Sequence, residues 1–330
     1  MTFLYDVTLR DGNHALRHQL TSDFVEKYCK LADKSGVWAV EVGHGNGLGA
    51  SSFLVGKSAE SDFELLSTAR EFLKNTKLAV HVIPGFATIR RDLIPAIECG
   101  VDVFRIATHS TEATVSEKHI SFLAERNVGV HGVLMMSHMN SIEGLISQAT
   151  LMANYGASAI ILMDSAGHLI PKEVKERVDA LKNALQIEIG FHAHNNLGVA
   201  VANTFEARSA GATIIDGASM GLGAGAGNAQ LENIVAASLR MNKYESGLDQ
   251  LLEMSQLVED SYPNNLPMTT ATSIRSGVAG VFSGYAPQVK ELSRELGIDI
   301  NLLWDEVGKR NLVAGQESMI REIANDLMNL

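Results

Sequence analysis

The sequence predicts an α/β fold, a (β/α)8 TIM barrel with a C-terminal helical extension. Short apolar runs alternate with helix-length amphipathic stretches eight times before residue 241, and eight parallel strands close a barrel of about 250 residues. Polar side chains gather where the apolar runs end, which is where the active sites of such barrels lie. An open, doubly wound sheet would not predict this ring of polar strand ends, so we favour the barrel.

Each βα unit carries its own strand and helix signals. The expected strands span residues 4–7, 38–42, 78–83, 103–106, 128–135, 159–163, 187–191 and 213–215. The expected helices span residues 22–35, 61–75, 89–99, 112–126, 141–155, 171–185, 197–210 and 229–241. Glycine stops helices by adopting the left-handed conformation, and five glycines stand before strands: Gly36, Gly100, Gly129, Gly156 and Gly211. We assign residues 1–241 to a catalytic TIM-barrel domain.

The remainder of the chain breaks this rhythm. Helical patterns recur at residues 246–260, 285–297, 299–309 and 316–329. We therefore expect a helical C-terminal domain of residues 242–330 that packs near the barrel mouth and covers the active site.

The composition limits the classes of partner. The 330 residues are 46% hydrophobic and carry a formal net charge of −11, and an acidic surface disfavours nucleic acid and anionic membranes. No apolar run is long enough to span a bilayer. The first residues enter a strand pattern without the segments of a secretory signal, so we expect a cytoplasmic enzyme.

Two histidines and an aspartate predict a metal site. His192 and His194 are two residues apart at the end of the seventh strand, so their imidazoles point to the same side. Asp11 follows the first strand and adds a carboxylate. This donor set suits Mn²⁺, Mg²⁺ or Co²⁺, without excluding Zn²⁺, and its open positions allow chelation of a 2-oxo acid. The alternative is a pair of hydrogen-bonded structural histidines.

Arg10 and His14 flank Asp11 and supply further chemistry. Arginine does not titrate near neutral pH, so Arg10 is suited to stabilise an enolate oxygen; otherwise it is a surface charge. His14 is a candidate general base, although a lone loop histidine is more often solvated. His44, after the second strand, is at most an outer neighbour of these groups.

A glycine-rich loop at residues 221–228 follows the eighth strand. It has two readings: phosphate binding, as in many barrels, or close backbone approach to a ligand with Asn228 pointing to the metal. It lacks the Lys-Ser/Thr of a P-loop.

Longer stretches resemble a metal-dependent lyase family that includes HMG-CoA lyase, isopropylmalate synthase and the 4-hydroxy-2-oxovalerate aldolases. The whole superfamily shares the Arg10-Asp11-Gly12 start and the His-x-His-Asn pair at residues 192–195. The closer similarity is to the 4-hydroxy-2-oxovalerate aldolases. It covers essentially the full length, through residues 9–19, 41–49, 107–113, 134–139, 164–167 and 223–228.

The resemblance implies a TIM barrel that cleaves a 4-hydroxy-2-oxo acid to pyruvate and an aldehyde. The metal would be held by Asp11, His192 and His194. Arg10 would stabilise the pyruvate enolate, and His14 would take the proton of the C4 hydroxyl. Ser165 would help to seat the pyruvate carboxylate.

The resemblance also implies partners. Family members often pair with an acylating acetaldehyde dehydrogenase, which receives the aldehyde through a tunnel and docks on the C-terminal domain. An oligomer and a place in aromatic hydrocarbon catabolism are implied as well.

Two departures from the family fall on the aldehyde side. The family usually carries a tyrosine where this sequence has Phe282, so a hydroxyl near the substrate C4 oxygen is missing; Tyr285 stands three residues away. The strand that usually carries leucines around the aldehyde has His81 and Ile83 instead. We predict that the pyruvate chemistry is kept while aldehyde choice or stereocontrol has shifted.

Two other functions remain open at this point. One is an acyl-CoA Claisen-type condensing enzyme or lyase of the same superfamily, which the longer similarity disfavours. The other is a non-catalytic scaffold for an aldehyde dehydrogenase, which the complete set of candidate catalytic residues disfavours.

Overall fold

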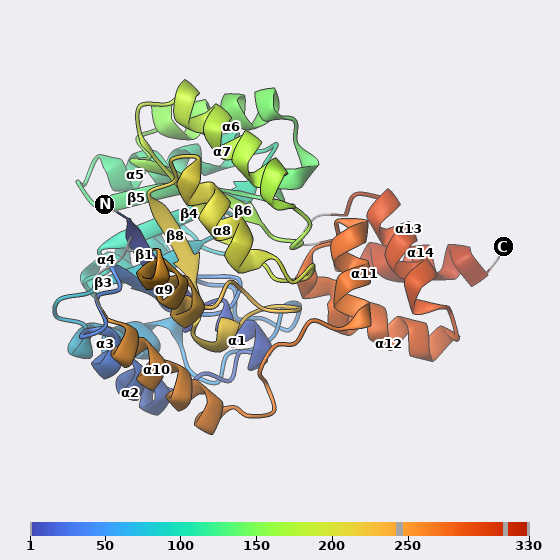
Figure 1. Ribbon diagram of the computed structural model, residues 1–330, viewed down its shortest axis with the longest axis horizontal. Helices are drawn as coiled ribbons and strands as arrows, with labels where there is room; N and C mark the ends of the chain where they lie inside the picture. Colours follow the sequence, from blue (N-terminus) through green and yellow to red (C-terminus); the bar gives the residue numbers. More distant parts are fainter. Residues whose placement is uncertain (1, 242–246, 313–315, 329–330) are drawn as a thin grey trace.

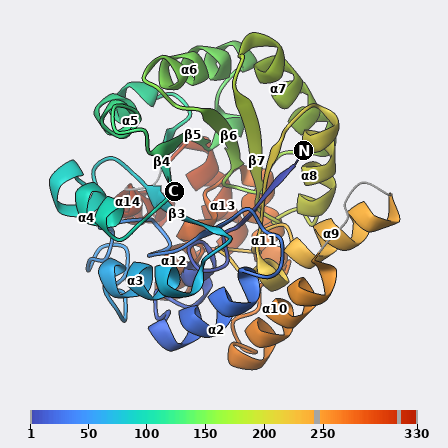
Figure 2. The ribbon, with the colours of Figure 1, turned by 90° about the vertical axis from the view of Figure 1, so that its left-hand side faces the viewer.

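The computed structural model describes residues 2–241, 247–312 and 316–328. Eight parallel strands pair in sequence order and close into a barrel, which confirms the predicted TIM fold (Figures 1 and 2). The strands are β1 (Phe3–Asp6), β2 (Ala39–Glu41), β3 (Lys77–Val82), β4 (Val103–His109), β5 (Gly129–Met135), β6 (Ala159–Asp164), β7 (Glu188–Ala193) and β8 (Ile214–Gly217).

Helices surround the barrel as an outer ring, which Figure 2 shows end-on. They are α2 (Ser22–Ala32), α3 (Asp62–Phe72), α4 (Ile94–Glu98), α5 (Glu117–Ala124), α6 (Ile142–Asn154), α7 (Pro171–Ala184), α8 (Ala200–Ser209) and α9 (Leu231–Arg240). The single turn α1 (Gly12–Ala15) lies instead at the barrel mouth (Figure 1). Each expected helix of the barrel region is present, although α4 is short and follows a π-helical turn at Ile89–Leu93.

Four of the five expected helix-stop glycines have the left-handed backbone that this role requires: Gly36, Gly100, Gly156 and Gly211. The fifth expectation, Gly129, is wrong. Gly129 is the first residue of β5, and Asn127, with φ 55°, takes the left-handed position after α5. Asparagine tolerates this conformation better than most residues, because its short polar side chain can form local hydrogen bonds.

Alternate residues of the strands fill the barrel interior. One apolar cluster inside the barrel includes Tyr5, Val103, Val133 and Ile161. Above it, toward the carboxyl ends of the strands, charged side chains replace the apolar ones, and Arg105 in the middle of β4 is fully buried. Charges are rarely buried without partners, so this part of the interior requires a paired network.

After the barrel, α10 (Leu248–Ser261) still packs against α2 and α9. The predicted domain boundary adjoins residues 242–246, outside the described part of the chain. Beyond α10 come α11 (Ala271–Ala279), α12 (Ala286–Leu296), α13 (Ile300–Lys309) and α14 (Glu317–Met328). These last four helices have a separate apolar core that includes Trp304 and Ile320.

The helices α11 to α14 lie beside the carboxyl-end mouth of the barrel (Figure 1). Barrel loops hold α11 in place: Asn196 Nδ2 donates to Ser276 Oγ at 2.9 Å. His168 Nδ1 lies 2.7 Å from the Gly277 carbonyl oxygen, and His138 Nε2 lies 3.0 Å from that of Gly280. In the described part of the chain, no helix is long and apolar enough to cross a membrane.

Candidate active site

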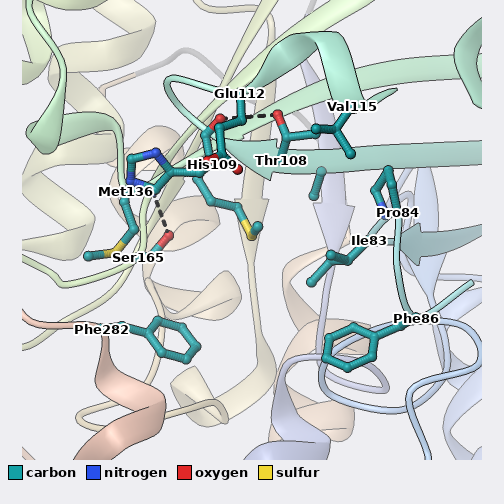
Figure 3. A pocket seen from close by; sticks show the side chains of 12 residues that line it. Ile83, Pro84, Phe86, Thr108, His109, Glu112, Val115, Met136, Ser165 and Phe282 are labelled. Atoms are coloured by element: carbon teal, nitrogen blue, oxygen red, sulfur yellow. Dashed lines mark hydrogen bonds between the residues drawn. The ribbon is translucent and has the colours of Figure 1, made fainter. Parts of the chain in front are cut away.

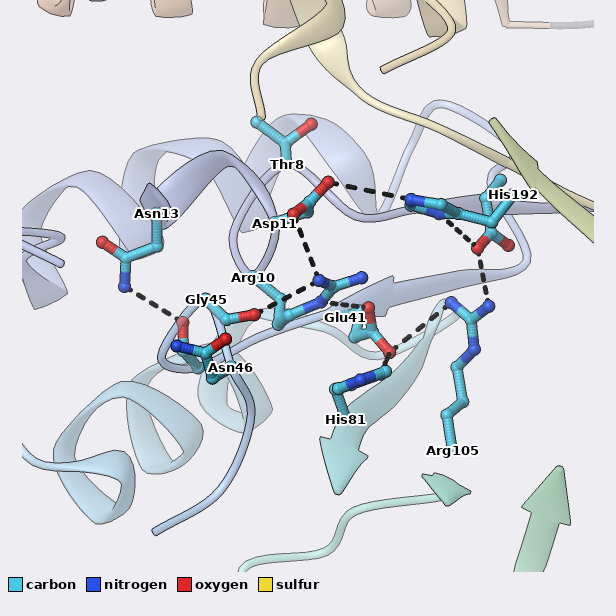
Figure 4. A network of polar contacts seen from close by, with 12 residues as sticks. Thr8, Arg10, Asp11, Asn13, Glu41, Gly45, Asn46, His81, Arg105 and His192 are labelled. Carbon is cyan, nitrogen blue, oxygen red and sulfur yellow. Dashed lines mark hydrogen bonds and ion pairs between the residues drawn. The ribbon is translucent and has the colours of Figure 1, made fainter. Parts of the chain in front are cut away.

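The loop after β1 and the end of β7 bring three side chains to one point at the barrel rim. Figure 4 shows two of them, Asp11 and His192. Asp11 Oδ2 lies 3.7 Å from His192 Nε2 and 3.6 Å from His194 Nε2. The two Nε2 atoms are 3.3 Å apart. All three side chains are buried. The sequence-predicted ligand set therefore lies together as one group able to hold a metal ion.

The protonation states of this group suit a divalent cation. Burial alone would raise the pKa of Asp11, but Arg10 and the nearby histidines outweigh it and hold that pKa well below its usual range. Burial lowers the pKa of His194 to about 4, so its imidazole is neutral at pH 7. His192 Nδ1 lies 2.9 Å from Asp216 Oδ2. The carboxylate accepts the Nδ1–H, which leaves the His192 Nε2 lone pair for a metal.

Arg10 lies beside this ligand group. Its Nε donates to Glu41 Oε2 at 2.7 Å, and its Nη1 lies 3.3 Å from Asp11 Oδ1. Nη1 also donates to the Gly45 carbonyl oxygen at 3.3 Å. Nη2 is buried without a hydrogen-bond partner among the residues that the structure describes. Because an unpaired buried donor is costly, this N–H group is available to an acceptor on a bound ligand.

His14 lies in α1, with Nε2 3.9 Å from Asp11 Oδ1. Burial lowers the pKa of His14 to about 4, so the ring is neutral and able to accept a proton at pH 7. Gly45 leaves room for the ring, since a Cβ there would come within 2.6 Å of it. His14 also lines an open cavity of about 800 Å³ between the barrel mouth and the start of α12.

The glycine-rich loop after β8 closes over the ligand group. Asn228 Nδ2 donates to Asp11 Oδ2 at 2.7 Å and to the Leu222 carbonyl oxygen at 2.9 Å. A Cβ at Gly223 would come within 2.2 Å of Asn228 Nδ2, so a side chain there would displace the asparagine. Of the two readings of this loop, close backbone approach agrees with these contacts.

A smaller cavity of about 180 Å³ opens beside the strand ends, lined by Ile83, Phe86, Ser165 and Phe282 among others (Figure 3). Ser165 Oγ accepts the Met136 N–H at 3.1 Å, so its own hydroxyl hydrogen is free to donate. The two phenylalanines also line the larger cavity. This smaller cavity is largely apolar apart from a few groups such as Ser165, which is typical of a pocket for a small organic ligand.

Three other sequence-predicted residues lie in different surroundings. His81 Nδ1 lies 3.6 Å from Glu41 Oε1, so the ring faces the charged network rather than the smaller cavity. Tyr285 is buried in the C-terminal core, and its ring meets that of Phe282 edge-on at 5.6 Å. The His44 ring stacks on His18 at 3.6 Å. Their predicted contributions to the site stay predictions.

Three buried charges of the site were missed by the sequence analysis as functional residues: Glu41, Arg105 and Asp216. Arg105 Nη2 donates to Asp216 Oδ2 at 2.6 Å, and its Nη1 donates to Glu41 Oε1 at 3.4 Å. The available signal was the alternation of inward and outward residues along a strand. Each of these charges occupies an inward position directly after an apolar residue.

This network strengthens the fit to a cation. With Arg10 and Asp11 included, two buried arginines face three buried carboxylates. A buried cluster with surplus negative charge is stabilised by a bound cation. The residues present therefore fit a divalent metal ion.

Comparisons with known proteins agree with this geometry. Residues 2–258 match the HMGL-like family, and residues 267–329 match the DmpG-like communication domain. A 4-hydroxy-2-oxovalerate aldolase of Pectobacterium atrosepticum is 48% identical over 326 residues, covering 98% of this chain and 95% of that protein. One from Spirochaeta aurantia is 48% identical over 324 residues, with coverage of 98% and 95%.

Among solved structures, a carboxyl transferase domain of Rhizobium etli pyruvate carboxylase with pyruvate superimposes with a TM-score of 0.82 at 18% identity. It covers 98% of this chain and 60% of that one. At this identity the likeness concerns the fold alone. The full-length similarity decides the family: the chain belongs to the HMGL-like family and, within it, to the 4-hydroxy-2-oxovalerate aldolases, and it is a carbon–carbon lyase.

Proposed function

We propose that this protein cleaves a 4-hydroxy-2-oxo acid, such as 4-hydroxy-2-oxopentanoate, to pyruvate and an aldehyde in a divalent-metal-dependent retro-aldol reaction. The observation that carries the proposal is the ligand group of Asp11, His192 and His194 beside the unpartnered Nη2 of Arg10. Mn²⁺ is the proposed metal, with Mg²⁺ or Co²⁺ as alternatives, because oxygen and imidazole donors suit these ions.

The metal would be held by Asp11, His192 and His194. When bound, it would act as a Lewis acid toward the 2-oxo acid. Asn228 and Asp216 keep two of the ligands in place through hydrogen bonds of 2.7 Å to Asp11 and 2.9 Å to His192.

His14 and Arg10 have different proposed roles in the cleavage of the C3–C4 bond. His14, neutral at pH 7, takes the proton of the C4 hydroxyl as the C3–C4 bond breaks and the C4 oxygen becomes the aldehyde carbonyl. The electron pair of that bond enters the pyruvate enolate. Arg10 donates to the enolate oxygen through Nη2, and a fixed guanidinium does this without titrating. Addition of one proton at C3 then gives pyruvate, and release of the proton that His14 took restores the neutral imidazole, so no net proton is consumed.

Ser165 is proposed to bind the pyruvate carboxylate. Its Oγ already accepts the Met136 N–H, so its hydroxyl hydrogen is available to a further acceptor. The cavity that Ser165 shares with Ile83 and Phe282 is the proposed aldehyde pocket. With phenylalanine at this position, residue 282 offers an aromatic ring but no hydroxyl to the C4 oxygen. We propose that aldehyde choice or stereocontrol is altered accordingly.

The C-terminal helices are the proposed docking element for an acylating acetaldehyde dehydrogenase. The match of residues 267–329 to the DmpG-like communication domain supports this role. The position of α11 and α12 over the larger cavity would also let this domain cover the active site. An oligomer is part of the same proposal.

The test is pyruvate release from racemic 4-hydroxy-2-oxopentanoate, coupled to lactate dehydrogenase and NADH oxidation. We expect no release after EDTA treatment, recovery with added Mn²⁺, and no recovery in Asp11→Asn. No release by the Mn²⁺-loaded wild type would reject the proposal and call for an assay of acetyl-CoA-dependent thiol release. The altered pocket is rejected if acetaldehyde and propanal are the best acceptors by kcat/KM with strict stereochemistry at C4.

A further inference from the structure

Arg105 lies in the barrel interior below the proposed metal site (Figure 4). It is fully buried in β4, and its guanidinium contacts carboxylates from two other strands. Nη2 donates to Asp216 of β8 at 2.6 Å, and Nη1 donates to Glu41 of β2 at 3.4 Å. Its Cζ atom also lies 4.9 Å from the centroid of the Tyr5 ring.

Each of these carboxylates contacts a residue of the proposed catalytic machinery. Asp216 uses the same Oδ2 to accept from His192 Nδ1 at 2.9 Å. Glu41 uses its other oxygen, Oε2, to accept from Arg10 Nε at 2.7 Å. An unbroken chain of hydrogen bonds and ion pairs therefore runs from the enolate-binding arginine to a metal-binding histidine, and Arg105 is its central link.

The two carboxylates depend on Arg105 to different degrees. Among the described residues, Arg105 is the one arginine or lysine that pairs with Asp216, with Nη2 2.6 Å from Oδ2. Glu41 has Arg10 as a second and closer cation, at 2.7 Å compared with 3.4 Å for Arg105. Removing a partner from a buried charge leaves that charge uncompensated. Loss of Arg105 would therefore leave Asp216 without its arginine partner, whereas Glu41 would keep Arg10.

We propose that Arg105 is a positioning residue for both halves of the active site, an inference that rests on the proposed function. Through Asp216 it orients His192 for the metal. Through Glu41 it orients Arg10 for the enolate oxygen. A planar guanidinium supplies two separated N–H groups in fixed directions, whereas a lysine ammonium keeps the charge without bridging both carboxylates.

The experiment measures binding to folded protein rather than turnover. Dissociation constants for Mn²⁺ and for oxalate, a planar analogue of the pyruvate enolate, are measured by calorimetry, the latter at saturating Mn²⁺. Arg105→Lys is compared with wild type and with Arg70→Lys. Arg70 is a matched control, because it pairs with Asp102 at 2.9 Å at the opposite, amino-terminal end of the strands.

We expect Arg105→Lys to weaken Mn²⁺ binding by about 10- to 100-fold, the range found when partners that orient metal ligands are removed. Oxalate binding should weaken in the same variant, and Arg70→Lys should change neither constant. Mn²⁺ and oxalate constants within about twofold of wild type, together with a lower melting temperature, would show a purely structural ion pair and overturn the proposal.

Two further variants keep the proposal testable should Arg105→Lys not fold. Each breaks one arm of the chain: Asp216→Asn should weaken mainly Mn²⁺ binding, and Glu41→Gln should weaken mainly oxalate binding. If the Mn²⁺ and oxalate dissociation constants of both variants equal those of the wild type, the positioning role is overturned. Failure of the wild type to bind Mn²⁺ would instead reject the metal-dependent function, and with it this inference.

Discussion

The Nε2 atoms of His192 and His194 lie 3.3 Å apart. At this distance both nitrogens cannot carry a proton without repelling each other. Asp11 Oδ2 lies within 3.7 Å of both. The described structure thus gathers three electron-pair donors around one point, and a bound cation would offset their mutual repulsion.

Metal binding is therefore expected to stabilise the fold. A ligand present at 100 times its dissociation constant adds about 2.7 kcal/mol to the free energy of unfolding. We predict that Mn²⁺ raises the melting temperature of wild type and leaves that of His194→Gln unchanged. His119→Gln, a change of the same type at α5 away from the ligands, is the control and should respond like wild type. A Mn²⁺ response in His194→Gln would remove His194 from the ligand set.

Some residues of this site could be predicted from the sequence and others could not, because their local sequence patterns differ. Asp11 and His194 stand in loops or at strand ends, where polar residues are visible against apolar runs. Their convergence was predictable because the carboxyl ends of parallel strands share one rim. Arg105 stands inside a strand, and only its partners on distant strands, Glu41 and Asp216, show that its charge is compensated.

Besides the single turn α1, the helix α11 (Ala271–Ala279) was also missed. Its sequence contains serine, threonine and glycine, which have modest helix propensity. Tertiary contacts hold it instead: Asn196 bonds to Ser276, and Gly277 packs so closely that a Cβ there would lie 2.9 Å from the Asn196 Cβ. Such contacts between distant segments have no local pattern in the sequence.

Arg10→Ala should abolish turnover while Mn²⁺ remains bound. The variant is expected to fold, because Glu41 keeps Arg105 as a cationic partner at 3.4 Å. Loss of a donor to a developing oxyanion typically lowers kcat by about 10²- to 10³-fold, and Arg10 also supplies a full charge. Pyruvate release and Mn²⁺ affinity would be measured on the same preparation. Retained turnover would assign enolate stabilisation to another group.

His14→Ala should slow C–C cleavage much more than exchange of the pyruvate C3 protons. Only cleavage requires a base for the C4 hydroxyl, whereas exchange would take place at the proposed metal and Arg10. Exchange is followed by NMR in deuterated buffer, and cleavage by pyruvate release. Equal losses in the two reactions would contradict the assignment of His14 as the base for the C4 hydroxyl.

Phe282→Tyr should raise the preference for one C4 enantiomer. The substitution adds a hydroxyl at a ring that lines the smaller cavity. A neutral hydrogen bond is worth about 0.5–1.5 kcal/mol, so the ratio of kcat/KM values for the two enantiomers should change by about 2- to 10-fold. Phe86→Tyr, at the other phenylalanine of the same cavity, is the control. An unchanged ratio in Phe282→Tyr would show that residue 282 does not control the stereochemistry at C4.

His131 should make the barrel sensitive to acid. Its ring lies inside the barrel with Nδ1 3.2 Å from the Tyr5 hydroxyl, and it is only 6% exposed. Burial, with a further effect of Arg105, lowers the pKa of His131 to about 3, whereas an unfolded histidine titrates near 6.5. Between pH 6.5 and the folded-state pKa, His131 is therefore mostly protonated in the unfolded chain and mostly neutral in the folded protein.

The contribution of neutral His131 to the free energy of unfolding is thus fully present above pH 6.5. It declines as the pH falls toward the folded-state pKa. For this one residue the loss between pH 7 and pH 5 is about 2 kcal/mol. Urea unfolding at both pH values should show this loss in wild type and a loss smaller by that amount in His131→Gln, which keeps a polar partner for Tyr5. Because the comparison uses the change with pH within each protein, any constant cost of the substitution cancels. Equal pH-dependent losses in the two proteins would mean that other buried histidines, and not His131, set the acid sensitivity of the barrel.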